Sequence, residues 1–192
     1  TVAVLLVVGV AVYLITRKKS SKKSFWTAKT MAVGAMCMAL SSVLSLIKLW
    51  SMSMGGSVTP ASMLPLLLFA YCYGVGPGMV LGALYGVMQF LLDGMAWAAL
   101  GAIPNLLDYP IAFGLLGLAG CFRGSKAKMT AGFVLGCFGR FMASFLSGFI
   151  FYGQYAPEGV NPVWYSLTYN GSYMLVECII CIALGLLVGE RL

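Results

Sequence analysis

Histidine is absent from this chain and charged residues are scarce, which excludes several classes of function. Charged residues make up 9% of the 192 residues, whereas soluble domains contain roughly a quarter. Serine intramembrane proteases need a Ser–His pair and zinc proteases need the HExxH motif, so neither chemistry is available. An aspartyl protease needs two facing aspartates, yet the second aspartate, Asp93, falls near a predicted loop. We therefore predict no enzymatic activity.

Metal and nucleic-acid sites are not expected either. The one CxxC pair, Cys178 and Cys181, lies in an apolar run and has no second pair to complete a zinc site. The net charge of +7 is concentrated between Arg17 and Lys29 and between Arg123 and Lys128, beside apolar runs. That placement is typical of membrane topology signals rather than of a phosphate-binding face. We predict no cofactor, no metal and no nucleic-acid partner.

Hydrophobic residues are what the chain has in abundance, at 61% of its length. Because apolar runs of about 20 residues span a bilayer, the pattern predicts an all-α integral membrane protein. A run over residues 2–16 predicts one extra N-terminal transmembrane helix, and a basic loop extends it to residue 26. A cleaved signal peptide is the alternative, but no small-residue cleavage site follows. The domain over residues 27–192 is predicted to be a six-helix bundle, with runs at 27–49, 61–73, 78–92, 99–122, 130–152 and 163–189.

The loop charges predict how these helices are oriented. If each run crosses the bilayer once, the loops at 17–26, 74–77 and 123–129 share one side and hold every loop lysine and arginine. By the positive-inside rule that side is cytoplasmic, and the C-terminus lies there too. We expect a multi-pass protein of the cell membrane. Its outer loops, at 50–60, 93–98 and 153–162, carry no basic residue.

Ionisable side chains inside membrane spans need a partner or a function. At a rise of 1.5 Å per residue, Asp108, Ser144 and Asn170 lie ~10–13 Å below the outer helix ends. Arg140 and Glu177 lie deeper, at ~18–21 Å. One interpretation pairs Arg140 with Glu177 and leaves Asp108 for a cationic ligand. The alternative pairs Asp108 with Arg140.

Aromatic residues surround the upper polar group. Tyr109 is adjacent to Asp108, Tyr152 lies two turns after Ser144, Tyr165 lies near Asn170, and Trp97 precedes the Asp108 helix. Aromatic residues at the membrane interface are often only anchors. Together with a carboxylate at the same depth, they favour a site for a flat organic cation.

Three ordered motifs resemble a known family: "LLDYPIAFGLLGLAGCFRG", "SGFIFYGQYAPEG" and "YSLTYNG". The chain is similar, over about residues 30–190, to the thiamine-specific S components (ThiT family) of energy-coupling factor (ECF) vitamin transporters. The resemblance implies a six-helix bundle with a thiamine pocket near the outer face. It implies no enzyme activity in the S component, because two partner ATPases drive uptake. It also implies that Ala35 and Ala39 contact the transmembrane coupling subunit.

The resemblance completes the predicted substrate-binding set. Family positions that contact the ligand correspond to Asp108, Tyr109, Tyr152, Tyr165 and Asn170, and a family lysine and histidine correspond to Arg140 and Ser144. With Trp97, the predicted site is Asp108, Tyr109, Ser144, Tyr152, Tyr165, Asn170, Trp97 and Arg140. Asp108 replaces a glutamate of the family and Tyr152 replaces a tryptophan. A second family tryptophan aligns with the region around Gly56.

The predicted ligand is thiamine or a related small cationic heterocycle, captured for ATP-driven uptake. Two alternatives stay open at this point. One is an S component or a stand-alone facilitator for another vitamin or precursor. The other is a structural membrane protein in which Asp108 is paired internally.

Overall fold

The structure of the chain is a computed structural model that describes residues 26–52, 55–95, 98, 101–157 and 159–188. The predicted N-terminal helix and Trp97 fall outside the described residues. The α-helices are α2 (Ala28–Leu46), α3 (Leu64–Tyr73), α4 (Val75–Gln89), α5 (Ala102–Leu106), α6 (Ala112–Leu115), α7 (Lys126–Phe151) and α8 (Pro162–Val188). Shorter turns of other helix types are η1 (Phe90–Gly94), η3 (Leu107–Ile111), η4 (Leu116–Cys121) and η5 (Gly153–Tyr155). One two-residue strand pair, β1 (Trp50–Ser51) and β2 (Ser57–Val58), interrupts an otherwise helical fold.

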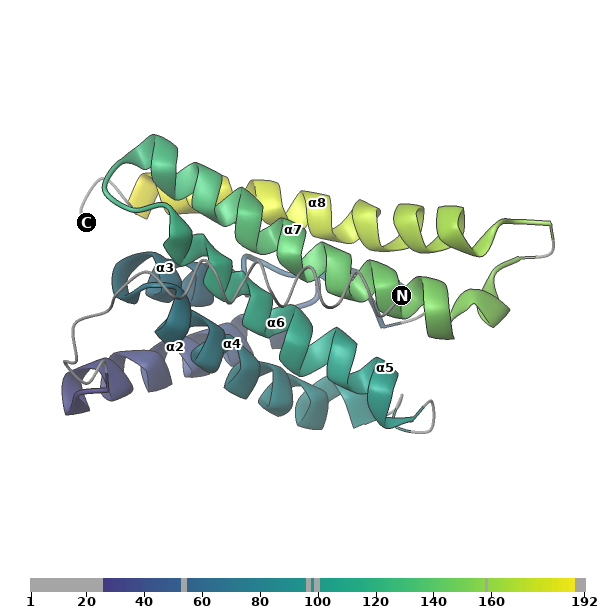
Figure 1. The fold of residues 1–192 in the computed structure, drawn as a ribbon, viewed down its shortest axis with the longest axis horizontal. Coiled ribbons are helices and arrows are strands. Elements are labelled where there is room, and N and C mark those ends of the chain that lie inside the picture. Colours follow the sequence, from purple (N-terminus) through teal and green to yellow (C-terminus); the bar gives the residue numbers. More distant parts are fainter. Residues whose placement is uncertain (1–25, 53–54, 96–97, 99–100, 158, 189–192) are drawn as a thin grey trace.

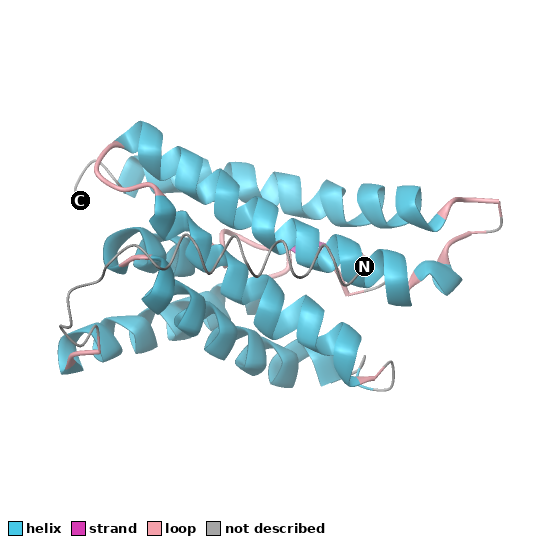
Figure 2. Ribbon diagram, in the orientation of Figure 1, coloured by secondary structure: helices cyan, strands magenta, loops and turns pink. Residues whose placement is uncertain are grey.

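The helices form a bundle in which α7 and α8 run side by side along one edge (Figure 1). The opposite edge is formed by α2 and α4, and α5 and α6 lie between α4 and α7. Helix dominates every layer of the bundle (Figure 2). Among the residues that the structure describes, five helical stretches are long and apolar enough to cross a membrane: Ala28–Leu46, Val75–Gly94, Ala102–Cys121, Lys126–Phe151 and Pro162–Val188. The observed class is the predicted one.

The run at 61–73 departs from prediction, because only its second part is a helix. Helix α3 has 10 residues, which gives a length of ~15 Å, about half of the hydrocarbon core of a bilayer. Pro65 lies in the first turn of α3, where its missing N–H is tolerated. The segment before it is non-helical but buried, with Thr59 4% and Met63 1% exposed. The next helix also begins earlier than predicted, at Val75.

The predicted outer loop at 50–60 folds back against the bundle, and its Val58 is buried. Its strands pair Trp50 with Val58 in antiparallel register. Val58 packs against Tyr173 and Met174 of α8. The backbone N–H of Gly56 donates a hydrogen bond to the hydroxyl of Tyr169, 3.1 Å away. We call residues 50–52 and 55–58 the β-ribbon.

One detail of the predicted charge distribution is wrong. Helix α2 ends at Leu46, so Lys48 lies beyond the helix and belongs to the loop that was expected to lack basic residues. Its Nζ forms an ion pair with Asp93 Oδ1 at 2.8 Å, on the exposed rim of the bundle. The neighbouring carboxylate therefore neutralises this lysine.

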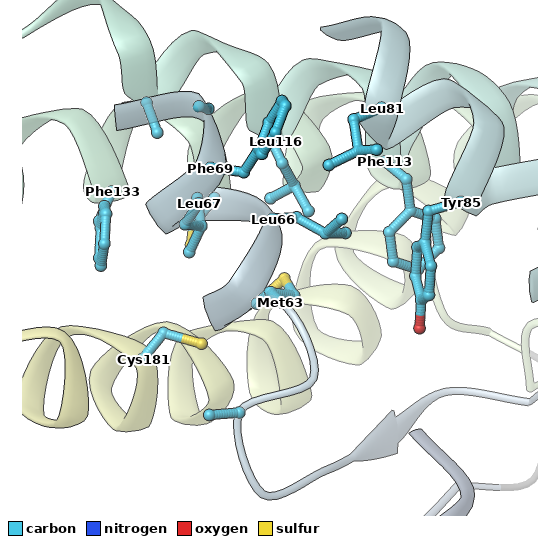
Figure 3. Packing of buried hydrophobic residues seen from close by; sticks show 14 of the residues in the cluster. Met63, Leu66, Leu67, Phe69, Leu81, Tyr85, Phe113, Leu116, Phe133 and Cys181 are labelled. Carbon is cyan, nitrogen blue, oxygen red and sulfur yellow. The ribbon is translucent and has the colours of Figure 1, made fainter. Parts of the chain in front are cut away.

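Close packing of α4 fixes the position of the polar segment that follows it in the bundle. A Cβ atom on Gly82 would lie 2.2 Å from the carbonyl oxygen of Phe113, and one on Gly86 would lie 2.4 Å from that of Tyr109. Glycines four residues apart on α4 thus allow the backbones to approach closely. The apolar core contains Met63, Leu66, Leu67, Phe69, Leu116, Phe133 and Cys181 (Figure 3).

Candidate functional site

Asp108 and Tyr109 lie where a transmembrane helix changes its winding. Pro110 has no N–H, and its ring would clash with the carbonyl four residues earlier in a regular α-helix. The backbone instead forms a π-helical turn over Leu107–Ile111, between α5 and α6. Such turns often mark functional sites, because they redirect side chains within a helix. Here the turn brings Asp108 into the wall of an internal cavity.

Hydroxyl groups are the partners of Asp108. The Oγ of Ser147, a fully buried residue on α7, donates a hydrogen bond to Asp108 Oδ2 at 2.7 Å. Ser144 and Tyr152 line the cavity together with Asp108. Within the described part of the chain, Asp108 forms no ion pair. Its carboxylate is thus held in place without being neutralised at contact distance.

Arg140 and Glu177 form the buried ion pair. Arg140 Nη1 lies 4.0 Å from Glu177 Oε2, and the guanidinium lies 4.1 Å above the ring centroid of Phe113. Glu177 Oε1 accepts hydrogen bonds from Thr59 Oγ1 at 2.5 Å and from Ser62 Oγ at 2.8 Å. Of the two pairings considered from the sequence, the structure contains the one between Arg140 and Glu177.

A single cavity of about 120 Å³ collects most of the predicted site. It lies between α4, η3, α7, α8 and the β-ribbon. Seven of the eight predicted residues line it, namely Asp108, Tyr109, Arg140, Ser144, Tyr152, Tyr165 and Asn170. The residues that the helix rise placed at one depth, Asp108, Ser144 and Asn170, therefore do line one cavity. Their role as ligand contacts stays a prediction.

Tyrosines form one wall of the cavity. Tyr165, Tyr169 and Tyr173 follow one another at four-residue spacing along one face of α8. The first two ring centroids are 5.9 Å apart and the next two are 6.0 Å apart. Across the cavity, the ring of Tyr109 meets the edge of Phe90 at 5.4 Å. Rings in these orientations offer both faces and edges to a flat aromatic ligand.

Asn170 has protein partners for both ends of its amide. Its Nδ2 donates to the carbonyl oxygen of Ser166 at 3.0 Å, and its Oδ1 accepts from the Tyr173 hydroxyl at 3.1 Å. Nearby, a Cβ atom on Gly148 would lie 2.4 Å from Ser166 Oγ, so α7 and α8 approach closely at this point. The Nδ2 of Asn170 also lies 3.4 Å from the carbonyl oxygen of Ser144 on α7, so Asn170 joins the two helices and shapes the cavity wall.

Several residues in or next to the cavity were not predicted from the sequence. Tyr169 and Tyr173 extend the spacing that starts at Tyr165, and Ser147 follows Ser144 by three residues on the same helical face. Both spacings could have been used to predict these residues from the sequence. The contribution of Gly56 could not have been predicted, because it depends on the β-ribbon folding back against α8.

Ala35 and Ala39 lie elsewhere, on the exposed face of α2. Helix α2 packs against α3 and α4 through its other side, where Gly34 meets Leu81 and Phe69. The exposed face also carries large apolar side chains, such as Met36, which is 71% exposed. This surface is open to lipid or to another membrane protein.

Comparison with known proteins places the chain among transporters. Residues 31–191 match the model of a family described as thiamine transporter protein. Thiamine transporter ThiT of Bacillus subtilis is 38% identical over 145 residues, which is 68% of this chain and 73% of that protein. Thiamine transporter ThiT of Lacticaseibacillus paracasei is 33% identical over 134 residues, with shares of 62% and 67%.

The fold has a counterpart among solved structures. The structure of ThiT from Listeria monocytogenes matches with a TM-score of 0.73 at 21% identity, covering 84% of this chain and 93% of that one. The likeness confirms the predicted class, an all-α membrane bundle.

Proposed function

The chain belongs to the thiamine transporter protein family, and from this premise we propose that it is a substrate-binding S component that captures thiamine for uptake by an ECF transporter. The role of the family is transport rather than catalysis, and several apolar helices make this chain a multi-pass membrane protein. Both curated relatives carry thiamine in their names. The specific ligand of this chain is part of the proposal.

The arrangement around Asp108 supports this ligand. Thiamine carries a permanent positive charge on its thiazolium ring and has a second flat ring. A carboxylate held by Ser147 and lacking an ion-pair partner in the described chain provides a counter-charge. The tyrosine wall of α8 provides surfaces for the rings, since aromatic faces attract cations. One cavity combines both features.

The proposal includes the partners and the orientation. The cavity faces the outside of the cell, and the C-terminus lies in the cytoplasm. The exposed face of α2 at Ala35 and Ala39 contacts the transmembrane coupling subunit, and two ATPase subunits bound to that subunit supply the energy. The division into residues 1–26 and a binding domain at 27–192 remains a prediction.

A titration of the purified chain in detergent tests the proposed ligand. Thiamine, thiamine phosphates, the pyrimidine precursor, riboflavin and biotin are compared by fluorescence quenching and by the shift in melting temperature. We expect saturable binding of thiamine and a rise in melting temperature that follows its concentration. Selective binding of riboflavin or biotin would reassign the chain to another vitamin. No response to any compound would contradict the proposal and favour a structural role.

A further inference from the structure

Glu177 is a buried acidic residue that the proposed binding site does not use directly. Its side chain is 1% exposed, and it is not among the residues that line the cavity. Two hydroxyl groups, from Thr59 and Ser62, donate hydrogen bonds to its Oε1, and its Oε2 faces Arg140. These contacts are the ones that stabilise a carboxylate anion.

The contact between Arg140 and Glu177 is mainly electrostatic, because the two charged groups are close but poorly hydrogen-bonded to each other. The closest approach between the two groups is 4.0 Å, and within the described chain Nε and Nη1 of Arg140 have no hydrogen-bond partner. Arg140 lines the cavity, whereas Glu177 lies behind it. The positive charge of Arg140 thus lies at the cavity wall, and the negative charge of Glu177 lies on the far side of the guanidinium.

The sum of charges decides which ligands the cavity attracts. Asp108 and Arg140 line it with opposite charges, and Asp93 at its rim is neutralised by Lys48. Without Glu177, the charges of Asp108 and Arg140 would cancel. A cation would then be attracted by one group and repelled by the other. With Glu177 included, these three groups carry one net negative charge.

We propose that Glu177 is a specificity-determining residue that gives the cavity its net negative charge, and so makes it select a monocationic ligand over phosphorylated forms of that ligand. The inference rests on the proposed function, because it assumes thiamine as the monocation. Glu177 acts through Arg140 and does not touch the ligand. A unit charge roughly 10 Å away, at an effective dielectric constant of about 20, changes affinity by about tenfold.

The test compares two ligands on matched variants. Dissociation constants for thiamine and for thiamine monophosphate are measured for the wild type, for Glu177→Gln and for Thr59→Val. Glu177→Gln keeps the side-chain shape and removes the charge, so the preference for thiamine over its monophosphate is expected to fall about tenfold. Thr59→Val removes one hydrogen bond to Glu177 but no charge. It is expected to lower the melting temperature and leave the preference unchanged.

An unchanged preference in a folded Glu177→Gln protein would overturn the inference, and so would an equal loss of preference in Thr59→Val. If Glu177→Gln alone does not fold, Glu177 is tested in an Arg140→Gln background, where the double variant Arg140→Gln/Glu177→Gln removes both charges, a change that buried pairs often tolerate. The preference of the double variant for thiamine is expected to be about tenfold lower than that of Arg140→Gln. Equal preferences in these two variants would overturn the inference. A wild-type protein that binds neither compound would contradict the proposed function itself.

Discussion

The Oγ atom of Ser147 lies 2.7 Å from Oδ2 of Asp108 and donates a hydrogen bond to it from the neighbouring helix. Ser147 is fully buried and is not among the cavity-lining residues, so this bond orients the carboxylate from behind. The relationship links a packing contact between η3 and α7 to the proposed recognition of a cation.

Ser147→Ala is therefore expected to weaken thiamine binding by about ten- to a hundredfold, because a hydrogen bond to a charged group contributes roughly 1.5–3 kcal/mol. The effect is measured by fluorescence titration. Ser42→Ala serves as the control, since Ser42 bonds only to its own helix at Met38. Equal affinities for Ser147→Ala and the wild type would show that Asp108 does not need this orientation.

Gly82→Ala tests the close approach of α4 to the Asp108 segment. The new methyl group would meet the carbonyl oxygen of Phe113 at 2.2 Å, and backbone cannot move aside as a side chain can. Overpacking of this kind costs about 1–3 kcal/mol, so we expect a lower melting temperature. Gly76→Ala on the same helix is the matched control, because no atom lies within 4 Å of its added Cβ. Similar melting temperatures for the two variants would contradict the packing described for α4.

Bulky substitutions on α2 separate binding from transport. Ala35→Trp and Ala39→Trp are expected to abolish uptake in cells while leaving thiamine affinity in detergent unchanged, because both residues lie on the exposed face, away from the cavity. Leu175→Trp is the control, since Leu175 is 63% exposed but lies on α8 rather than on α2, and it does not line the cavity. Full uptake by the Ala35 and Ala39 variants would remove this face from the proposed coupling interface.

The polar residues of the site were predictable because helix geometry is regular. A fixed rise per residue placed Asp108, Ser144 and Asn170 at one depth, and the structure joins them in one cavity. The same regularity predicted the deeper pair of Arg140 and Glu177. Apolar length predicted the five long spans, since a bilayer imposes that length on any helix that crosses it.

Features that depend on contacts between distant segments were not predictable. The segment at 50–60 was predicted as an outer loop, and its contact with α8 through Tyr169 brings Gly56 into the cavity lining. The shortened helix α3 follows from the buried, non-helical segment around Thr59, which Glu177 holds by a hydrogen bond from a distant helix. The sequence contains Pro110, whose ring clashes with the backbone of a regular α-helix. It does not determine that the helix adapts by a π-helical turn rather than in another way.

The central claim is that Asp108 is the counter-charge for a cationic ligand, and the most direct measurement compares thiamine affinity in Asp108→Asn and Asp93→Asn. Both variants remove one carboxylate from the cavity lining, but Asp93 is already paired with Lys48. We predict that Asp108→Asn weakens binding by about 1–3 kcal/mol and that Asp93→Asn changes it by less than about 1 kcal/mol. Wild-type affinity in a folded Asp108→Asn protein would contradict the claim.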